Sequence, residues 1–437
     1  MTRDLYSLLL PRRTKFIEKF IFLLVCLSLV VGAALGQATA PPTRIDLDQA
    51  IQLALAHNHA LMAARTQVQQ SQAQETTAGL RPNPVLTWDS LFIPVFSPSQ
   101  FNSDYLNNIT EFDALVAYTI ERGHKRQARL QAARDQTKVV SSQVSDTERN
   151  LTFNVAQLFI GVLLAKSNLK VAEENLDSFR ETVNISEARF KAGAISEADL
   201  LKIRVQLLQF QMDVSAAKLA ATQSLANLRQ LLGYNSVPAD YDVIGELAYA
   251  PLKLNQEDLQ LLALKQRPDL LAAQEGITAA QSQYRLAKAN GKRDLTTTMG
   301  YTRVGAANNA SFFFNVEIPI FDRNQGEIAR THYAITQAQE GATAASEAVM
   351  TDVADSFQAL QTSEKVIQLF SSGYLKQARD SRDISEYAYK RGAASLLDFL
   401  DAERSYRATQ FAYRQALANY QLSLEQVREA VGTRNLP

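Results

Sequence analysis

The chain has 437 residues, in which 45 lysine and arginine residues balance 45 aspartate and glutamate residues. This balance argues against a nucleic-acid partner, because nucleic-acid binding draws on an excess of positive charge. Glycine, with 17 residues, and proline, with 12, are sparse. The abundance of alanine, glutamine, leucine, arginine and glutamate is typical of long helices.

The N-terminal segment has the layout of a secretory signal peptide, which we assign to residues 1–36. Small residues follow an apolar run over 20–35, and basic residues precede it: Arg3, Arg12, Arg13, Lys15 and Lys19. An uncleaved membrane anchor is the alternative. The only cysteine, Cys26, lies in the apolar run and cannot form an internal disulfide. We expect no later stretch to be long and apolar enough to cross a membrane as a helix.

The first half of the mature chain is predicted to combine long helices with a strand hairpin. Its first helix stops where Pro82 and Pro84 remove backbone donors. The next helix is very long, because only Gly161, and no proline, interrupts the sequence between Gly123 and Gly193. The predicted elements are a helix over 46–80, strands over about 85–96 and 111–121, one helix of roughly 70 residues over 122–191, and a helix over 196–232.

The second half repeats this order with a shorter strand hairpin. The excess of the first hairpin lies at its tip, where insertions are tolerated. The predicted elements are a helix over 256–290, strands over about 295–303 and 311–320, a second long helix over 325–390, and a return helix over 395–431.

Similarity between the two halves indicates a tandem repeat. The turn at Gly193 recurs at Gly392, and the interval from each to the next glycine, Gly233 or Gly432, is the same. Self-similarity over such a long period means two copies of one structural unit. We therefore divide the mature chain into a first repeat over 37–235, a linker over 236–253 and a second repeat over 254–437.

The predicted strands carry one apolar face and one mostly polar face. In the second pair, Phe312, Phe314 and Val316 share a face, while Asn315 and Glu317 lie on the other. This alternation suits strands between lipid and water. Four strands cannot close a membrane barrel, which needs at least eight, so either the chain shares a barrel with copies of itself or the strands are not transmembrane. A soluble antiparallel coiled coil is the alternative, since both return helices carry apolar residues at heptad spacing.

Several segments resemble the TolC family of outer-membrane efflux proteins. The opening segment over 45–55 and each Gly-Ala-x-Ser-x-x-Asp turn before a return helix follow that family's pattern. The motif Ile120-Glu121-x-Gly123-x-Lys125-Arg126 is similar to the CzcC-like, heavy-metal branch. The resemblance covers nearly all of the mature chain.

This resemblance implies the fold class: a mainly α protein with a membrane β part, built from two tandem repeats of helix, β-hairpin, long helix and helix. A homotrimer would share one 12-stranded β-barrel in the outer membrane of a Gram-negative-type bacterium, on a periplasmic α-helical barrel. The implied function is the exit duct of a tripartite efflux system, passively passing substrates such as heavy-metal cations. The implied partners are a periplasmic membrane-fusion adaptor, an RND-type inner-membrane pump and outer-membrane lipid.

The resemblance also implies roles for residues near the two helical turns. Asp398 and Asp401 match acidic positions that line the periplasmic aperture, although Ser395 and Asp398 also fit a helix-capping box. Asp199 and Tyr389 match positions that link neighbouring hairpins. The residues expected to dock on the adaptor are Gly193, Ala194, Ile195, Ser196, Gly392, Ala393, Ala394 and Ser395.

The sequence argues against catalysis and against a resident metal or cofactor. His57 and His59 lie two positions apart, which places them on different faces of a helix. The sequence contains no phosphate loop, nucleophile elbow or zinc-protease motif. We therefore expect a protein that is not an enzyme and has no cofactor. The alternative function is a periplasmic coiled-coil adaptor or structural protein that does not enter the outer membrane.

Overall fold

The computed structural model describes residues 43–437. The predicted signal peptide, residues 1–36, lies outside the described residues, as does Cys26. Of the described chain, residues 43–44 and Pro238–Asp242 belong to a small compact unit. Ile45–Val237 and Val243–Pro437 form a large unit, which holds the long helices and the four-stranded sheet.

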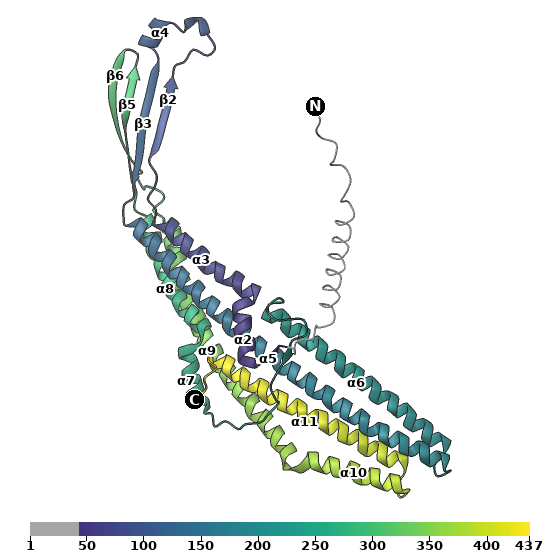
Figure 1. The fold of residues 1–437 in the computed structure, drawn as a ribbon. Helices are drawn as coiled ribbons and strands as arrows, with labels where there is room; N and C mark the ends of the chain where they lie inside the picture. The colour runs from purple at the N-terminus through teal and green to yellow at the C-terminus, as the bar shows by residue number, and fades with distance from the viewer. Residues whose placement is uncertain (1–42) are drawn as a thin grey trace, which may run out of the picture. The chain divides into compact units, whose positions relative to one another are not determined.

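The sheet of the large unit is antiparallel and has the strand order β2–β3–β5–β6, so β2 and β6 form its two edges (Figure 1). Its strands are β2 (Val85–Leu91), β3 (Glu111–Ile120), β5 (Leu295–Val304) and β6 (Ala307–Val316). The described chain also contains the two-residue strands β1 (Arg44–Ile45) and β4 (Asp242–Val243).

The two strand hairpins close differently. Only Gly305 and Ala306 join β5 to β6, and Gly305 adopts the left-handed φ of +57° that such a tight turn requires. A longer connection joins β2 to β3 and contains the short helices η1 (Pro98–Gln100) and α4 (Ser103–Asn108). The first hairpin is therefore the longer one.

Strand pairing stops earlier than the sequence suggests at the ends of β2 and β6. Pairing ends at Leu91 rather than near residue 96, and at Val316 rather than near residue 320. Pro94 and Pro319 follow within three residues. Because proline has no N–H group to donate to a neighbouring strand, these segments cannot continue the ladder.

One face of the sheet is apolar and exposed, and the other is mostly polar. On the apolar face, Trp88 is 72% exposed and Phe314 is 73% exposed. On the polar face, Asp89 lies opposite Asp113, and the hydroxyl oxygens of Thr302 and Ser311 lie 2.8 Å apart. So large an exposed apolar surface calls for a non-aqueous neighbour.

The helices of the large unit confirm the long helix of the first half, since α5 has 67 residues. The helices, in chain order, are α2 (Leu47–His57), α3 (His59–Gly79), α5 (Lys125–Lys191), α6 (Glu197–Leu232), α7 (Gln256–Gln266), α8 (Pro268–Asn290), α9 (Gln325–Leu369), the π-helical turn η2 (Phe370–Tyr374), α10 (Leu375–Arg391) and α11 (Leu396–Val431).

Three helices predicted as continuous are interrupted. Asn58 leaves the helical conformation between α2 and α3, and its side chain accepts from the Leu61 N–H at 3.0 Å. Arg267 also leaves the helical conformation, between α7 and α8. It precedes Pro268, which cannot donate a helical hydrogen bond. In the second long helix, Gly373 adopts a φ of +119° within η2, so α9 and α10 are separate helices.

The helices pack around α5, which contacts α3, α6, α8 and α11. We expected no helix of the mature chain to be long and apolar enough to cross a membrane. This expectation was wrong for α5, which contains an 18-residue window with a mean hydropathy of 1.4 and passes by length and composition. Half of this window is buried within the fold. Packing within the chain therefore accounts for half of the window.

The sheet should tolerate no side chain at Gly300. A Cβ atom added there would lie 2.1 Å from the Ala114 carbonyl oxygen and 2.7 Å from the Leu115 Cα atom, and neither backbone atom can move aside cheaply. We expect Gly300→Ala to lower the free energy of unfolding by about 1–3 kcal/mol or more. Thermal unfolding of the purified protein, followed by circular dichroism, measures this change.

Gly161→Ala is the matched control. Gly161 lies within α5, and an added Cβ atom would meet nothing within 4 Å. Alanine stabilises a helix interior by about 1 kcal/mol relative to glycine. The steric explanation fails if Gly300→Ala unfolds at the same temperature as the Gly161→Ala protein.

Candidate functional site

The helical hairpin turns contain the residues expected to contact the adaptor. At the first turn, between α5 and α6, Gly193 has a φ of +75° and its N–H donates to the Phe190 carbonyl at 2.9 Å. At the second turn, between α10 and α11, Gly392 has a φ of +77° and its N–H donates to the Tyr389 carbonyl at 3.0 Å. Each glycine thus ends its helix in the left-handed conformation, which is a sufficient local reason for its presence.

The small residues after these glycines are accessible. Gly193, Ala194, Gly392 and Ala393 are exposed. An added Cβ atom at Gly193 would meet no other atom within 4 Å. These positions leave room for close backbone approach by another protein.

The other residues of the turns serve mainly to start the next helices. Ser196 Oγ accepts from the Asp199 N–H at 3.1 Å, and Ser395 Oγ accepts from the Asp398 N–H at 3.2 Å. The remaining residues of the two turns, Ile195 and Ala394, are half-buried.

The two candidate aperture residues differ in their surroundings. The Asp398 carboxylate accepts from the N–H of Ser395 at 3.2 Å and from its hydroxyl at 2.7 Å, which completes a reciprocal capping box. Asp401 is exposed, and it forms no hydrogen bond or ion pair with the rest of the described chain. Local structure therefore accounts for Asp398 but not for Asp401.

The chain does not itself join Asp199 to Tyr389. Tyr389 is only 4% exposed, and its hydroxyl oxygen lies 3.4 Å from Ser186 Oγ. The Asp199 carboxylate lies 3.7 Å from Lys202 Nζ, one turn further along α6. The predicted link between these two residues stays a prediction.

Arg189 was missed by the sequence analysis and connects the two turns. From the last turn of α5, its Nη1 atom donates to the Tyr389 carbonyl oxygen at 2.6 Å. Its guanidinium carbon lies 5.1 Å from the centroid of the Tyr389 ring. A cation near the carboxyl end of α10 also complements the helix dipole. A single arginine near a helix end carries no sequence signal for such a role.

An aromatic stack continues this connection away from the turns. The Phe179 ring lies 4.5 Å from the Phe210 ring and 6.4 Å from the Phe399 ring, and Phe399 stacks on Tyr389 at 5.5 Å between centroids. These residues belong to α5, α6, α10 and α11. Both hairpins therefore share one hydrophobic core near their tips.

Glu403 is a second residue that the sequence analysis missed. It lies on α11 and is only 8% exposed. Burial raises the pKa of its carboxyl group, against the opposing effects of Arg382 and Arg407. Glu386 and Asp383 add like charge that favours the neutral acid. The heptad pattern of α11 gave no sign of a buried carboxyl group.

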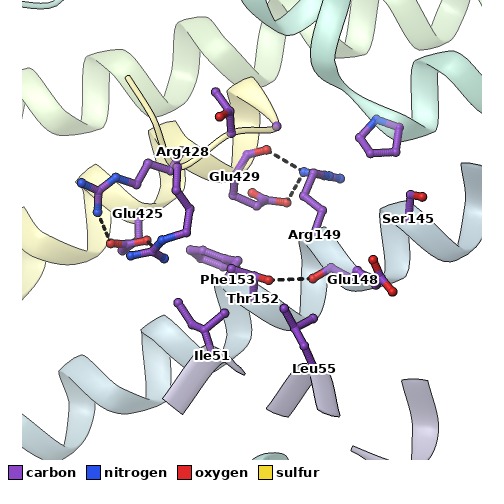
Figure 2. A pocket seen from close by; sticks show the side chains of 14 residues that line it. Ile51, Leu55, Ser145, Glu148, Arg149, Thr152, Phe153, Glu425, Arg428 and Glu429 are labelled. Carbon is purple, nitrogen blue, oxygen red and sulfur yellow. Dashed lines mark hydrogen bonds and ion pairs between the residues drawn. The ribbon is translucent and has the colours of Figure 1, made fainter. Parts of the chain in front are cut away.

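A separate pocket of ≈310 Å³ lies among α2, α5 and α11 (Figure 2). Its charged side chains have partners: Arg149 lies 2.6 Å from Glu429, and Arg428 pairs with Glu425. Within residues 43–437, no group of three or more histidine, cysteine, aspartate or glutamate side chains is arranged to hold a metal ion. The pocket offers stabilising ion pairs and no free acid, base or nucleophile among these residues.

Comparison with known proteins shows one family. A family model described as "Outer membrane efflux protein" matches residues 50–234 and 260–433, one segment in each half of the chain. The cobalt-zinc-cadmium resistance protein CzcC of Cupriavidus metallidurans is 25% identical over 363 residues, which cover 83% of this chain and 84% of CzcC. The pyoverdine export outer membrane protein OpmQ of Pseudomonas aeruginosa is 24% identical over 402 residues, covering 87% of this chain and 83% of OpmQ.

A solved structure has the same fold. The CmeC outer membrane channel of Campylobacter jejuni superposes with a TM-score of 0.74 at 18% identity, covering 88% of this chain and 85% of CmeC. At this identity the similarity concerns the fold alone.

Arg189→Gln should loosen the connection between the two hairpins. A hydrogen bond to a charged group contributes about 1.5–3 kcal/mol, which corresponds to a tenfold or greater change in a local opening equilibrium. We expect amide hydrogens in the last two turns of α10 to exchange about tenfold faster in the variant. Hydrogen exchange followed by mass spectrometry measures this rate.

Arg180→Gln is the control for this change. Arg180 also lies on α5 but pairs only with the exposed Asp177, three residues earlier. Its loss should leave exchange in α10 unchanged. Equal exchange rates in α10 for both variants would show that Arg189 does not hold the turns together.

Glu403→Gln should make the stability of the tip less dependent on pH. Because the folded-state pKa of Glu403 is raised, its contribution is fully present below the ordinary glutamate pKa of about 4.3 and is lost as the pH rises through the raised value. Glutamine cannot ionise, so the variant should have the higher unfolding temperature at neutral pH. Thermal unfolding over a range of pH tests this, with the exposed Asp401→Asn variant as control. A Glu403→Gln profile that coincides with the control profile contradicts it.

Proposed function

The chain belongs to the outer membrane efflux protein family, as its motifs predicted, and from this premise we propose that three copies form one exit channel. It is an outer-membrane efflux protein whose helical part lies in the periplasm. The alternative of a periplasmic coiled coil that does not enter the membrane is therefore set aside.

The sheet is the observation that carries the proposal. Its apolar face is exposed, and β2 and β6 leave two edges open. Lipid provides no hydrogen-bond partners for a strand edge, so a membrane sheet must close on itself. Four strands are too few for closure, whereas three copies supply the 12 strands that the family resemblance implies. We propose that β6 of one copy pairs with β2 of the next.

The helical part extends the channel into the periplasm. We propose that the repeats over 37–235 and 254–437, joined by the linker over 236–253, each contribute one helical hairpin to a tunnel wall. The exposed small residues at Gly193 and Gly392 support docking of a membrane-fusion adaptor at the two turns. An RND-type inner-membrane pump would deliver the cargo through that adaptor.

The aspartates near the second turn support a cation path. Three copies would bring the exposed Asp401 carboxylates together around one axis, with Asp398 one turn away on α11. A ring of carboxylates favours cations. We propose heavy-metal cations as the cargo, because the motif over 120–126 resembles the CzcC-like branch and CzcC itself is a cobalt-zinc-cadmium resistance protein. OpmQ, at nearly the same identity, is a pyoverdine export protein, so export of pyoverdine is the outcome that would replace this cargo.

The chain is proposed to act passively and not as an enzyme. The paired charges of the pocket between α2, α5 and α11 support this, since catalysis needs a free acid, base or nucleophile. No cofactor is proposed.

Deletion of the gene should sensitise the host to cobalt, zinc or cadmium salts, and the wild-type chain should restore growth. A variant with Ala194→Trp and Ala393→Trp should not restore growth, because bulk at both exposed turns prevents adaptor docking. The measurement is the minimal inhibitory concentration of each salt. We expect cells with the variant to have the minimal inhibitory concentration of the deletion strain, because a channel that does not dock on the adaptor cannot export the cargo.

The trimer itself is the control for this experiment. Both proteins should appear in outer-membrane fractions as a heat-sensitive trimer on gels, since the substituted turns lie far along the chain from the sheet. Full metal resistance with the variant would rule out docking at the turns. A monomeric protein found outside the membrane fraction would rule out the channel.

A further inference from the structure

A second pocket of ≈310 Å³ is lined by residues from the end of β3 and the start of α5. Figure 1 shows that β3 leads into α5 where the sheet meets the helices. The lining of the pocket combines two arginines, Arg81 and Arg126, with the apolar side chains Tyr118 and Ile120. Arg126 belongs to the 120–126 motif, and this residue has no role in the channel proposed above. The pocket joins basic groups to the end of the membrane-facing sheet.

The pocket carries surplus positive charge. Its one acidic residue, Glu121, is neutralised by Arg129, whose Nη1 atom lies 2.8 Å away. Arg126 donates from Nη1 to the Gly79 carbonyl oxygen at 3.3 Å, which is a neutral partner. Arg81 is exposed, and its guanidinium has no hydrogen-bond or ion-pair partner within the described chain. Two guanidinium groups are therefore available to an anion.

The segment that carries Arg81 is held firmly beside α5. Arg129 donates from Nε to the Ala78 carbonyl oxygen at 2.9 Å and from Nη2 to the Leu80 carbonyl oxygen at 2.9 Å. Pro82 follows and restricts the backbone further. These contacts fix the backbone of Arg81 relative to α5, which carries Arg126.

The apolar side of the pocket continues the exposed face of the sheet. Tyr118 and Ile120 alternate with Thr119 along β3 and share the face that carries Val116. Val116 is 42% exposed and Ile120 is 43% exposed. A ligand that fits must be amphipathic, with an anionic head at the arginines and a hydrocarbon part along the strand.

Basic residues also mark the other strand ends on the helical side of the sheet. Arg122, Lys292 and Arg323 are exposed and lie just after β3, just before β5 and after β6. At the opposite ends, Asp104 is the only charged residue in the connections over 92–110 and 305–306. Acidic residues lie in the same connections, since Asp294 precedes β5 and Glu317 and Asp322 follow β6. The helical ends of the strands are therefore rich in charged side chains of both signs, whereas the opposite ends are not.

We propose that the pocket binds an anionic phospholipid of the periplasmic leaflet. The guanidinium groups of Arg81 and Arg126 bind the phosphate of its headgroup, and an acyl chain lies along Tyr118 and Ile120. Arginine suits this role because its planar array of donors matches phosphate oxygens. The inference rests on the proposed barrel, since only strands in lipid bring this pocket to a headgroup.

The test uses the purified full-length trimer after removal of endogenous lipid. Phosphatidylglycerol or phosphatidylcholine is added, and native mass spectrometry counts the lipids that remain bound to each trimer. We expect the wild type to retain phosphatidylglycerol in preference to phosphatidylcholine. One basic residue near a membrane surface contributes about 1 kcal/mol, so Arg81→Gln should weaken phosphatidylglycerol binding about fivefold.

Arg404→Gln is the matched control, because Arg404 is also exposed and without a hydrogen-bond or ion-pair partner among the described residues but lies on α11. It should bind phosphatidylglycerol like the wild type. Equal retention of both lipids, or equal loss in both variants, overturns the proposal. So does displacement of the lipid by millimolar inorganic phosphate, which would show a site for free phosphate. A stable trimer in the membrane without lipid preference defeats only this inference, whereas failure to form a trimer defeats the proposed channel.

Discussion

The open edges of the sheet are the constraint on which the rest of the molecule depends. β2 and β6 each present backbone donors and acceptors that no other described strand satisfies. In lipid, each such group costs several kcal/mol. Water disfavours the exposed apolar face and lipid disfavours the open edges of a single copy, so in the proposed trimer association and insertion depend on each other. In that trimer the positions of the helices would follow from how the sheets meet, because short connections join the strands of each chain to α3, α5, α8 and α9.

At the far end of the helices, the two hairpins of one chain act as a single body. The stack of Phe179, Phe210 and Phe399 fills the space between them, and Arg189 joins their turns. The Asp398 carboxylate caps α11, whereas the Asp401 carboxylate makes no hydrogen bond or ion pair within the described chain. Small, exposed turns supported by a rigid shared core are suited to contact with another protein, since little conformational entropy remains to be lost on binding.

The features that were predictable from sequence are those set by local chemistry. The length of α5 follows from the near absence of glycine and proline, and the turns at Gly193 and Gly392 follow from the helix-ending preference of glycine. The break at Asn58 was not predictable in this way, because its Nδ2 atom donates to the carbonyl oxygen of Leu231, 173 positions away.

Tertiary partners explain the other omissions too. Arg189 and Glu403 gain their roles only where distant helices meet. Pro268 was a local signal for the break between α7 and α8, because proline is tolerated at the first position of a helix and not in its interior. Gly373 was ambiguous, since Gly161 and Gly341 lie in uninterrupted helix while Gly373 does not. In the first half, one unbroken helix, α5, therefore connects the sheet to the turn, whereas in the second half α9 and α10 make this connection with the π-helical turn η2 between them. Two halves of common design therefore differ in the continuity of their long helices, while the core around Phe179, Phe210 and Phe399 holds their tips together.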